Sequence, residues 1–250
     1  MTNERLRSAI AAADLSYTTF SEHLGVDRKT VERWITTDRL PHRSHRMDAA
    51  KVLEKTEGYL WPSTDIDPRT TSASRAELVD FYPNRGSVPT DLWTTLVGEA
   101  TEAIDLLAYA ASFFHDSVPG FADLLQERAR SGTSIRLLFG DPAAEAVSLR
   151  GEEEDIGALM SARCELTWRY LNPVAAKQGI HARQHRTTLY ASIFRFDDAL
   201  LVNPHAYGAP AGQSPVLHLA RIPGGRLYNH YMESFDRVWA TGAPVDSSAR

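Results

Sequence analysis

The chain has 250 residues, of which 43% are hydrophobic and 24% charged. This composition is ordinary for a globular protein. A chain of this length allows one large or two modest domains that are stable without covalent cross-links. The single cysteine, Cys164, excludes an intrachain disulfide and cysteine-based zinc sites. No apolar run is long enough to span a membrane, and no signal peptide is evident. We therefore expect a protein of the reducing cytoplasm with no membrane partner.

The net charge of −5 argues against nucleic-acid binding only until it is divided along the chain. Residues 1–60 hold ten Lys or Arg against nine Asp or Glu, whereas the remainder holds seventeen against twenty-three. Between Asp27 and Arg46 there are six Lys or Arg and only three acids. The positive charge is therefore local, and it falls on a segment that also carries helix signals.

The first sixty residues predict a run of short amphipathic helices. Residues 4–14 are rich in alanine, Ser16 is placed to cap a second helix, and a further helix is expected from Ser44 to Glu57. The apolar stripes of these helices are Leu6, Ile10 and Ala13 in the first, Phe20 and Leu24 in the second, and Met47, Ala50 and Leu53 in the last.

A short helix within Gly25–Trp34 is the most informative stretch. Gly25 permits a sharp turn after the second helix, and Asp27 is a good N-cap. Read at 3.6 residues per turn, one face is apolar and the opposite face is charged. The helix is expected to end at Thr36-Thr37-Asp38. The apolar residues are Val31, Trp34 and Ile35, and the charged residues are Arg28, Lys29, Glu32 and Arg33.

This pattern is typical of the recognition helix of a helix-turn-helix, which enters the major groove of DNA. Arg28, Lys29 and Arg33 are the predicted base contacts, because Arg and Lys side chains reach guanine O6 and N7. The alternative is an ordinary surface helix with solvated charges. Phosphate contacts are predicted for Ser16, Tyr17, Thr30, Arg39 and Arg43.

A resemblance to a known family rests on Phe20, Leu24–Val26, Lys29–Val31, Arg33–Trp34 and Arg39–Pro41. With this order of helices, residues 1–62 resemble the Cro/repressor-like (XRE-type) helix-turn-helix regulators. Tyr17 departs from that pattern, since the family often has a phosphate-binding Gln at its position. A tyrosine hydroxyl could serve the same contact.

Residues 63–88 are interpreted as a linker, ordered only near Ala76–Tyr82, because Ser63–Arg85 is rich in Ser, Thr, Asp and Pro and has no sustained apolar period. From residue 89 to 245 the pattern alternates between strands and helices and then gives a run of strands, which predicts an α/β domain with a mixed sheet. Helices are expected near 92–97, 121–129, 152–163 and 227–239. Strands are expected at 103–110, 134–140, 165–171, 188–196, 200–205 and 216–221.

Ile135–Asp141 and the helix ending at Gly132 give residues 89–245 a resemblance to one half of a phospholipase D-like fold. Active members of that superfamily carry His-x-Lys-x4-Asp, in which His is the nucleophile and Lys stabilises the phosphate charge. Here Tyr190 and Ser192 replace the His and Lys, and only Asp197 matches. Pro204-His205 replaces the following Gly-Ser. The resemblance therefore implies a catalytically inactive relative, without a cofactor.

Polar side chains are nevertheless dense on these last strands. They are interpreted either as satisfied polar residues around a core or as a pocket for a small-molecule or phosphate-bearing effector. The pocket residues are Tyr190, Ser192, Arg195, Asp197, Asn203, His205 and His218. Metal binding is not expected, because His181, His185, His205 and His218 lie on separate segments without metal-site spacing.

The fold class expected is therefore an all-α helix-turn-helix domain followed by an α/β mixed-sheet, phospholipase D-like domain. The function expected is a non-enzymatic transcription regulator whose partner is a double-stranded DNA operator. Residues 90–245 are expected to form a homodimer, because binding to two DNA half-sites commonly requires two helix-turn-helix domains. The alternatives are a nuclease or phosphodiesterase targeted by the helix-turn-helix, and a DNA-tethered protein scaffold.

Overall fold

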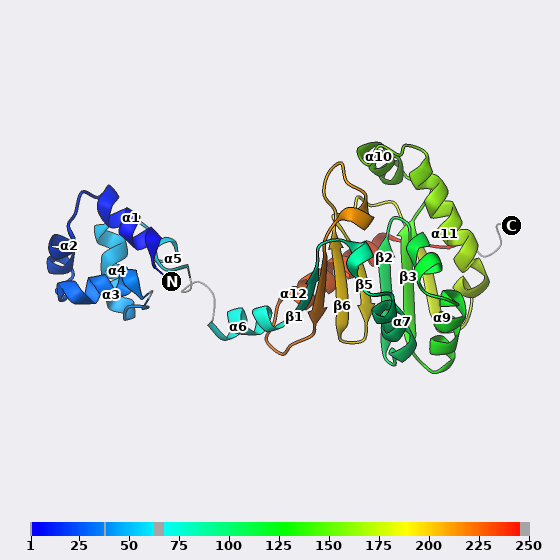
Figure 1. The fold of residues 1–250 in the computed structure, drawn as a ribbon, viewed down its shortest axis with the longest axis horizontal. Helices are drawn as coiled ribbons and strands as arrows, with labels where there is room; N and C mark the ends of the chain where they lie inside the picture. The colour runs from blue at the N-terminus through cyan, green and yellow to red at the C-terminus, as the bar shows by residue number, and fades with distance from the viewer. Residues whose placement is uncertain (1, 38, 63–67, 246–250) are drawn as a thin grey trace. The chain divides into compact units, whose positions relative to one another are not determined.

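The computed structural model describes residues 2–37, 39–62 and 68–245, with only the backbone of residues 68–71. The chain divides into two compact units, Met1–Ser72 and Ala73–Arg250. The first consists of helices, and the second is a mixed sheet with helices on both faces (Figure 1). The predicted fold class, helical and then α/β with a mixed sheet, is confirmed. Among the described residues, no helix is both long and apolar enough to cross a bilayer.

The first unit packs its helices around one apolar core. Phe20, Trp34 and Trp61 are among its buried side chains, and Trp34 contacts Trp61 edge-on with ring centroids 6.5 Å apart. Such a core supplies the burial that helices of this length need, since short helices are marginal alone. The helices are α1 (Glu4–Ala12), α2 (Tyr17–His23), α3 (Arg28–Thr36), α4 (Arg43–Val52) and α5 (Glu57–Leu60).

The predicted stripes of α1, α2 and α3 are buried, apart from Ala13, which is exposed beyond the end of α1. The prediction for the fourth helix was wrong in its end and for Met47. α4 ends at Val52, and Met47 is 55% exposed. Leu53 is buried and Ala50 is half-buried against the core, as predicted, and Ala49 is buried beside them. α3 ends at Thr36, and Asp38 lies outside the described residues.

An eight-stranded sheet organises the described part of the second unit, in the order β1-β7-β6-β5-β2-β3-β4-β8. β2 pairs in parallel with β3, and β3 with β4, whereas the remaining pairs are antiparallel. The strands are β1 (Leu78–Tyr82), β2 (Ala103–Ala108), β3 (Ser134–Gly140), β4 (Ile180–His185), β5 (Ala191–Phe196), β6 (Ala199–Pro204), β7 (Val216–Ala220) and β8 (Ala243–Pro244).

Helices cover both faces of this sheet (Figure 1). One face packs against α7, α8, α9 and the second half of α11, and the other against α10, the start of α11 and α12. Phe194 and Ile193, neighbours on β5, enter opposite cores, as strand alternation requires. The helices are α6 (Pro68–Ala76), α7 (Thr90–Glu99), α8 (Ser112–Ser117), α9 (Phe121–Arg130), α10 (Glu145–Glu153), α11 (Leu159–Ala175) and α12 (Leu227–Thr241).

The order predicted near Ala76–Tyr82 is found, as β1, but the ordered part of the predicted linker extends further in both directions. Residues 63–67 lie outside the described residues, but α6 follows them and β1 pairs with β7. Glu77, between α6 and β1, is buried, and its carboxylate accepts the N–H groups of Leu227 (2.8 Å) and Tyr228 (3.1 Å) at the start of α12. The pairing of β1 with β7 and the capping of α12 by Glu77 therefore fix the position of this segment, although it has no apolar period of its own.

Three element predictions between residues 150 and 190 were wrong. The helix predicted at 152–163 instead covers the end of α10, a turn and the start of α11. The strand predicted at 165–171 belongs to α11, where Cys164, Trp168 and Leu171 are buried at helical spacing while Leu166 is exposed. The alternation of large side chains in that stretch therefore misled the prediction. β4 was missed because Ile180–His185 is mostly polar, although its backbone pairs with β3 and β8.

Candidate functional site

Local sequence sets the start of α3. Asp27 accepts a hydrogen bond from the backbone N–H of Lys29 (2.7 Å), as predicted for an N-cap. Gly25, in the turn after α2, has φ +63°, a left-handed conformation that costs glycine little. Val31, Trp34 and Ile35 are buried, so the backbone of α3 is fixed by both its cap and its apolar side.

The opposite side of α3 presents cations to solvent. Arg28, Lys29 and Arg33 are exposed. Arg28 forms an i,i+4 ion pair with Glu32 (2.9 Å), whereas Lys29 and Arg33 have no acidic partner among the described residues. Exposed i,i+4 pairs are worth only about 0.3–0.5 kcal/mol, so Arg28 is easily released from Glu32. The helix can therefore offer three cations to a polyanion.

A groove of about 300 Å³ continues this surface beyond the end of α3. Thr30, Arg33 and Arg39, from the predicted set, line it together with two histidines. The structure does not bring the remaining predicted phosphate contacts into this groove. Ser16 caps α2 by accepting the N–H of Thr19 (3.1 Å), and Arg43 is exposed at the first position of α4. Tyr17 packs against the core of the first unit. The full groove lining is Thr30, Arg33, Trp34, Arg39, Leu40, Pro41, His42 and His45.

In the second unit, the sheet topology gathers polar residues at one edge. β1, β2 and β6 end there and β5 begins there, so loops from separate parts of the sequence meet. A cavity of about 410 Å³ lies among them. This volume falls within the range of small-molecule sites. The lining is Arg85, Tyr109, Ala110, Ser112, Phe113, Asp116, Glu154, Met160, Arg163, Ser192, His205, Pro210, Ala211 and Gly212.

Ser192 and His205 form a hydrogen-bonded pair in this lining. The Ser192 Oγ and His205 Nε2 are 3.0 Å apart, and His205 Nδ1 is 3.2 Å from the carbonyl oxygen of Leu189. A carbonyl accepts only, so Nδ1 carries the proton and the Ser192 hydroxyl donates to Nε2. Burial, reinforced by the positive charge of Arg150, lowers the pKa of His205 to about 4. The ring is therefore neutral at neutral pH and is a weak base.

Tyr109 holds this pair in place. Its hydroxyl accepts the backbone N–H of Leu189 (2.9 Å), the residue whose carbonyl oxygen accepts from His205. The Tyr109 ring also stacks on the His205 ring, with centroids 5.9 Å apart. Burial raises the pKa of Tyr109, so its hydroxyl stays protonated. The backbone of one residue, Leu189, thus positions both rings beyond the end of β2.

The predicted pocket is only partly assembled. Ser192 and His205 line the cavity, but Tyr190, Asn203 and His218 do not. Tyr190 is 83% exposed and precedes β5. Asn203 is buried and donates to the carbonyl oxygens of Ser214 (3.1 Å) and Pro215 (2.8 Å), which fixes the loop before β7.

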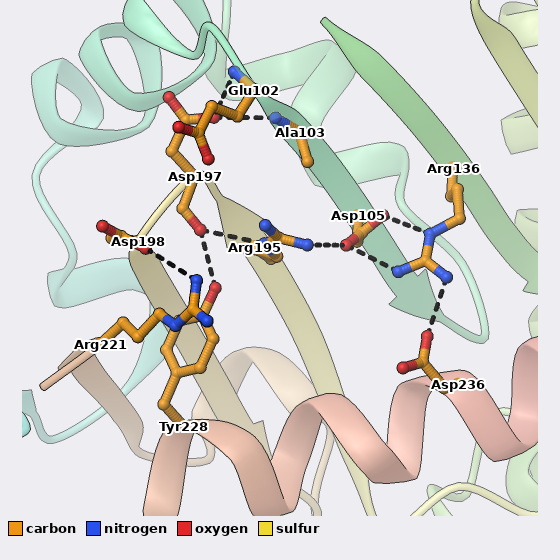
Figure 2. Close-up of polar contacts among 10 residues, drawn as sticks. All are labelled: Glu102, Ala103, Asp105, Arg136, Arg195, Asp197, Asp198, Arg221, Tyr228 and Asp236. Atoms are coloured by element: carbon orange, nitrogen blue, oxygen red, sulfur yellow. Dashed lines mark hydrogen bonds and ion pairs between the residues drawn. The ribbon is translucent and has the colours of Figure 1, made fainter. Parts of the chain in front are cut away.

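Arg195, also predicted for the pocket, belongs to an ion cluster on the other face of the sheet (Figure 2). The correction follows from strand geometry, since Arg195 is three residues, or about 10 Å, from Ser192 and alternates to the opposite face. Asp105 is buried between cross-strand neighbours on both sides. We call Asp105, Arg136, Arg195 and Asp236 the Asp105 cluster; its contacts are Arg136 to Asp105 (2.6 and 2.9 Å), Arg195 to Asp105 (3.0 Å) and Arg136 to Asp236 (2.8 Å).

Asp197, the one match to the phospholipase D-like motif, connects two parts of the sheet. Its carboxylate accepts backbone N–H groups from Thr101, Glu102 and Ala103, each at 2.8 Å, and so ties the β5–β6 turn to the start of β2. Burial raises the pKa of Asp197, but these hydrogen bonds outweigh it and lower the pKa overall. Asp197 does not line the cavity, so its prediction as a pocket residue is corrected.

Arg85 and Arg163 are cavity residues that the sequence reasoning missed. Arg85 comes from the short turn Arg85–Ser87 and Arg163 from α11, so each lies far along the chain from Ser192. No motif joins them, and only the fold brings them together. In the described part of the chain, no group of His, Cys, Asp and Glu is arranged to hold a metal ion.

No protein-family model and no curated protein matches this chain. Several solved structures are similar to it, and two of them illustrate the likeness. A phospholipase D family member, Nuc from Salmonella typhimurium, is 13% identical, covers 66% of this chain and 96% of its own, and gives a TM-score of 0.42. TrmBL2, an archaeal chromatin protein with a described mode of DNA binding, is 13% identical, covers 88% of this chain and 72% of its own, and gives a TM-score of 0.43. Both likenesses are weak, and neither assigns a role to a residue here.

Proposed function

We propose that this protein is a sequence-specific DNA-binding transcription regulator. The single observation that carries the proposal is the geometry of α3. It is a short capped helix with Val31 and Trp34 buried on one side, and with Lys29 and Arg33 exposed and free of acidic partners in the described chain on the other. A helix of this kind fits the major groove, and free guanidinium and ammonium groups bind guanine edges and phosphates.

The groove beyond α3 supports the same proposal. Arg33 and Arg39 line it from either side of the α3 end, which places a second cation beside the helix. Arg33 would read a base edge, and Arg39 would hold a phosphate and set the register of the helix. The acidic balance of the rest of the chain would suppress binding to unspecific sequences.

The second unit would serve dimerisation and effector sensing rather than hydrolysis. Of the phospholipase D-like motif only Asp197 is retained, and that carboxylate is occupied by backbone N–H groups. The edge strand of the sheet, β1, exposes Leu78, Val79 and Phe81, which are 46%, 56% and 54% accessible. A second copy could cover these side chains. Sedimentation of the full chain tests the dimer. Stable dimers persist at roughly tens of micromolar, so a monomer at that concentration would contradict the dimer.

Selection from a randomised DNA duplex library tests DNA reading. Full-length wild type is expected to enrich one sequence, and Lys29→Ala/Arg33→Ala to enrich none. Lys51→Ala is the matched control, because it removes an exposed cation from α4 in the same unit. If wild type enriches no sequence, the proposal is wrong. If wild type and the double variant enrich the same sequence, α3 is not the reading element.

A further inference from the structure

Two arginines in the cavity of the second unit have no acidic partner. Arg85 and Arg163 both line the cavity, and neither forms an ion pair with a described residue. The Arg85 guanidinium lies over the Phe113 ring, 4.2 Å from its centroid. Burial lowers the pKa of Arg85 to about 10, opposed by Glu154 and reinforced by Arg163, so it remains charged at neutral pH. Both arginines are half-buried, and a partly desolvated charge without an ion-pair partner favours an anion in the cavity.

The acids nearest to this cavity form no ion pair with Arg85 or Arg163 among the described residues, although the charge of Glu154 acts on Arg85 at longer range. Glu154 is buried, and its carboxylate accepts from Arg150 (2.7 Å). Arg150 is itself engaged elsewhere, since it also donates to Glu153 and to the carbonyl oxygens of Ala206 and Ala209. Asp116 is exposed and forms no ion pair with a described residue. The lone cations that face the cavity are therefore Arg85 and Arg163, within the described chain.

The remaining walls specify the rest of the ligand. Phe113, Met160 and Pro210 present apolar surface, which suits a molecule with an apolar body. The Ser192 hydroxyl donates its hydrogen to His205 Nε2 and keeps free lone pairs, so it can accept a hydrogen bond from a ligand hydroxyl. His205 is neutral and adds no charge.

We propose that this cavity binds a small organic phosphate monoester, with the phosphate between Arg85 and Arg163 and the organic body against Phe113 and Met160. A carboxylate has two oxygens, which one guanidinium fork satisfies, whereas a dianionic phosphate offers oxygens and charge for both forks. These arginines come from the β1–α7 connection and α11, outside the segment of the degenerate motif. The inference rests on the proposed effector-sensing role and names its ligand class.

Calorimetric titration of the full chain with phenyl phosphate, without DNA, tests the proposal. Wild type is expected to bind, and Arg85→Gln and Arg163→Gln to lose about tenfold or more in affinity, the usual worth of a charge-assisted hydrogen bond. Arg85→Lys, which keeps the charge but loses the fork, is expected to fall between wild type and Arg85→Gln. Arg169→Gln is the matched control, because Arg169 is an exposed arginine of the same helix as Arg163.

Two further probes separate the parts of the ligand. Inorganic phosphate is expected to bind more weakly than phenyl phosphate, and benzoate more weakly still. The proposal is overturned if phenyl phosphate does not bind, if Arg85→Gln binds it as wild type does, or if benzoate binds as tightly. Release of inorganic phosphate from phenyl phosphate would replace the binding role with an enzymatic one. None of these results depends on DNA binding, so failure here is distinguishable from failure of the proposed regulator.

Discussion

Arginine occupies two regions of the second unit in contrasting ways. In the Asp105 cluster, Arg136 and Arg195 flank one buried carboxylate and both form ion pairs with it (Figure 2). At the cavity edge, Arg85 and Arg163 are held without a carboxylate. The residue type is the same, but paired arginines cross-link strands, whereas unpaired ones are available to a ligand. The same distinction separates Arg28, paired with Glu32, from Arg33 on α3.

Breaking the Asp105 cluster gives the largest expected effect. Asp105→Asn leaves two guanidinium groups without their shared counterion, and we expect the free energy of unfolding to fall by about 3 kcal/mol or more. Asp236→Asn is the control, because Asp236 is 59% exposed and its loss should cost under about 1 kcal/mol. Equilibrium unfolding in urea measures both. Equal losses would show that Asp105 is no more important than a surface acid.

Acid should weaken the fold through His205. Its folded pKa of about 4 lies below the ordinary value of 6.5, so the unfolded chain binds a proton first as the pH falls. The free energy of unfolding should therefore decrease between pH 6.5 and 4 by an amount on the order of 3 kcal/mol. Urea unfolding of wild type and His205→Gln across this window isolates the contribution. A pH slope identical in the two proteins would contradict it.

Removing an unpaired arginine should hardly change stability. Arg85→Gln breaks no ion pair, and we expect the free energy of unfolding to stay within about 1 kcal/mol of wild type. Arg195→Gln should cost more, because it removes one of the two partners of buried Asp105. If the two variants are equally destabilised, the contrast between paired and unpaired arginines does not hold.

Releasing Arg28 should give the smallest effect. Glu32→Gln removes the acid that pairs with Arg28 and reduces negative charge on the exposed side of α3. We expect DNA affinity to rise by about 0.3–0.5 kcal/mol, the worth of such a pair. Fluorescence anisotropy at fixed salt measures the change, since salt alone shifts affinity. A lower affinity would show that Glu32 itself contacts DNA or orients Arg28.

Local signals allowed the α3 region to be predicted from sequence. Asp27, Gly25 and the apolar spacing of Val31 and Trp34 act within one or two turns, and the structure shows the cap, the left-handed turn and the buried face. The strands at 103–110 and 134–140 were also predicted within two residues of their ends. Continuous apolar runs of this kind carry the strand signal in the sequence itself.

The cavity could not be predicted in this way, because non-local pairing creates it. Arg85 reaches it only because β1 joins β7, in a stretch with the composition of a linker. Asp197 misled the prediction for the converse reason, since the residue that matches the motif makes a structural contact. Sequence spacing reports neighbours along a helix or strand, whereas a site built from loops of several strands requires the sheet order.

The most direct test of the proposed regulator is the ratio of affinities for the selected DNA sequence and a random duplex. Arg33→Ala should lower this ratio about tenfold, since a bidentate base contact is worth about 1–3 kcal/mol and acts on the selected sequence alone. Random-duplex affinity should fall much less. An equal loss on both duplexes would make Arg33 a phosphate contact, and an unchanged ratio would contradict sequence reading by α3.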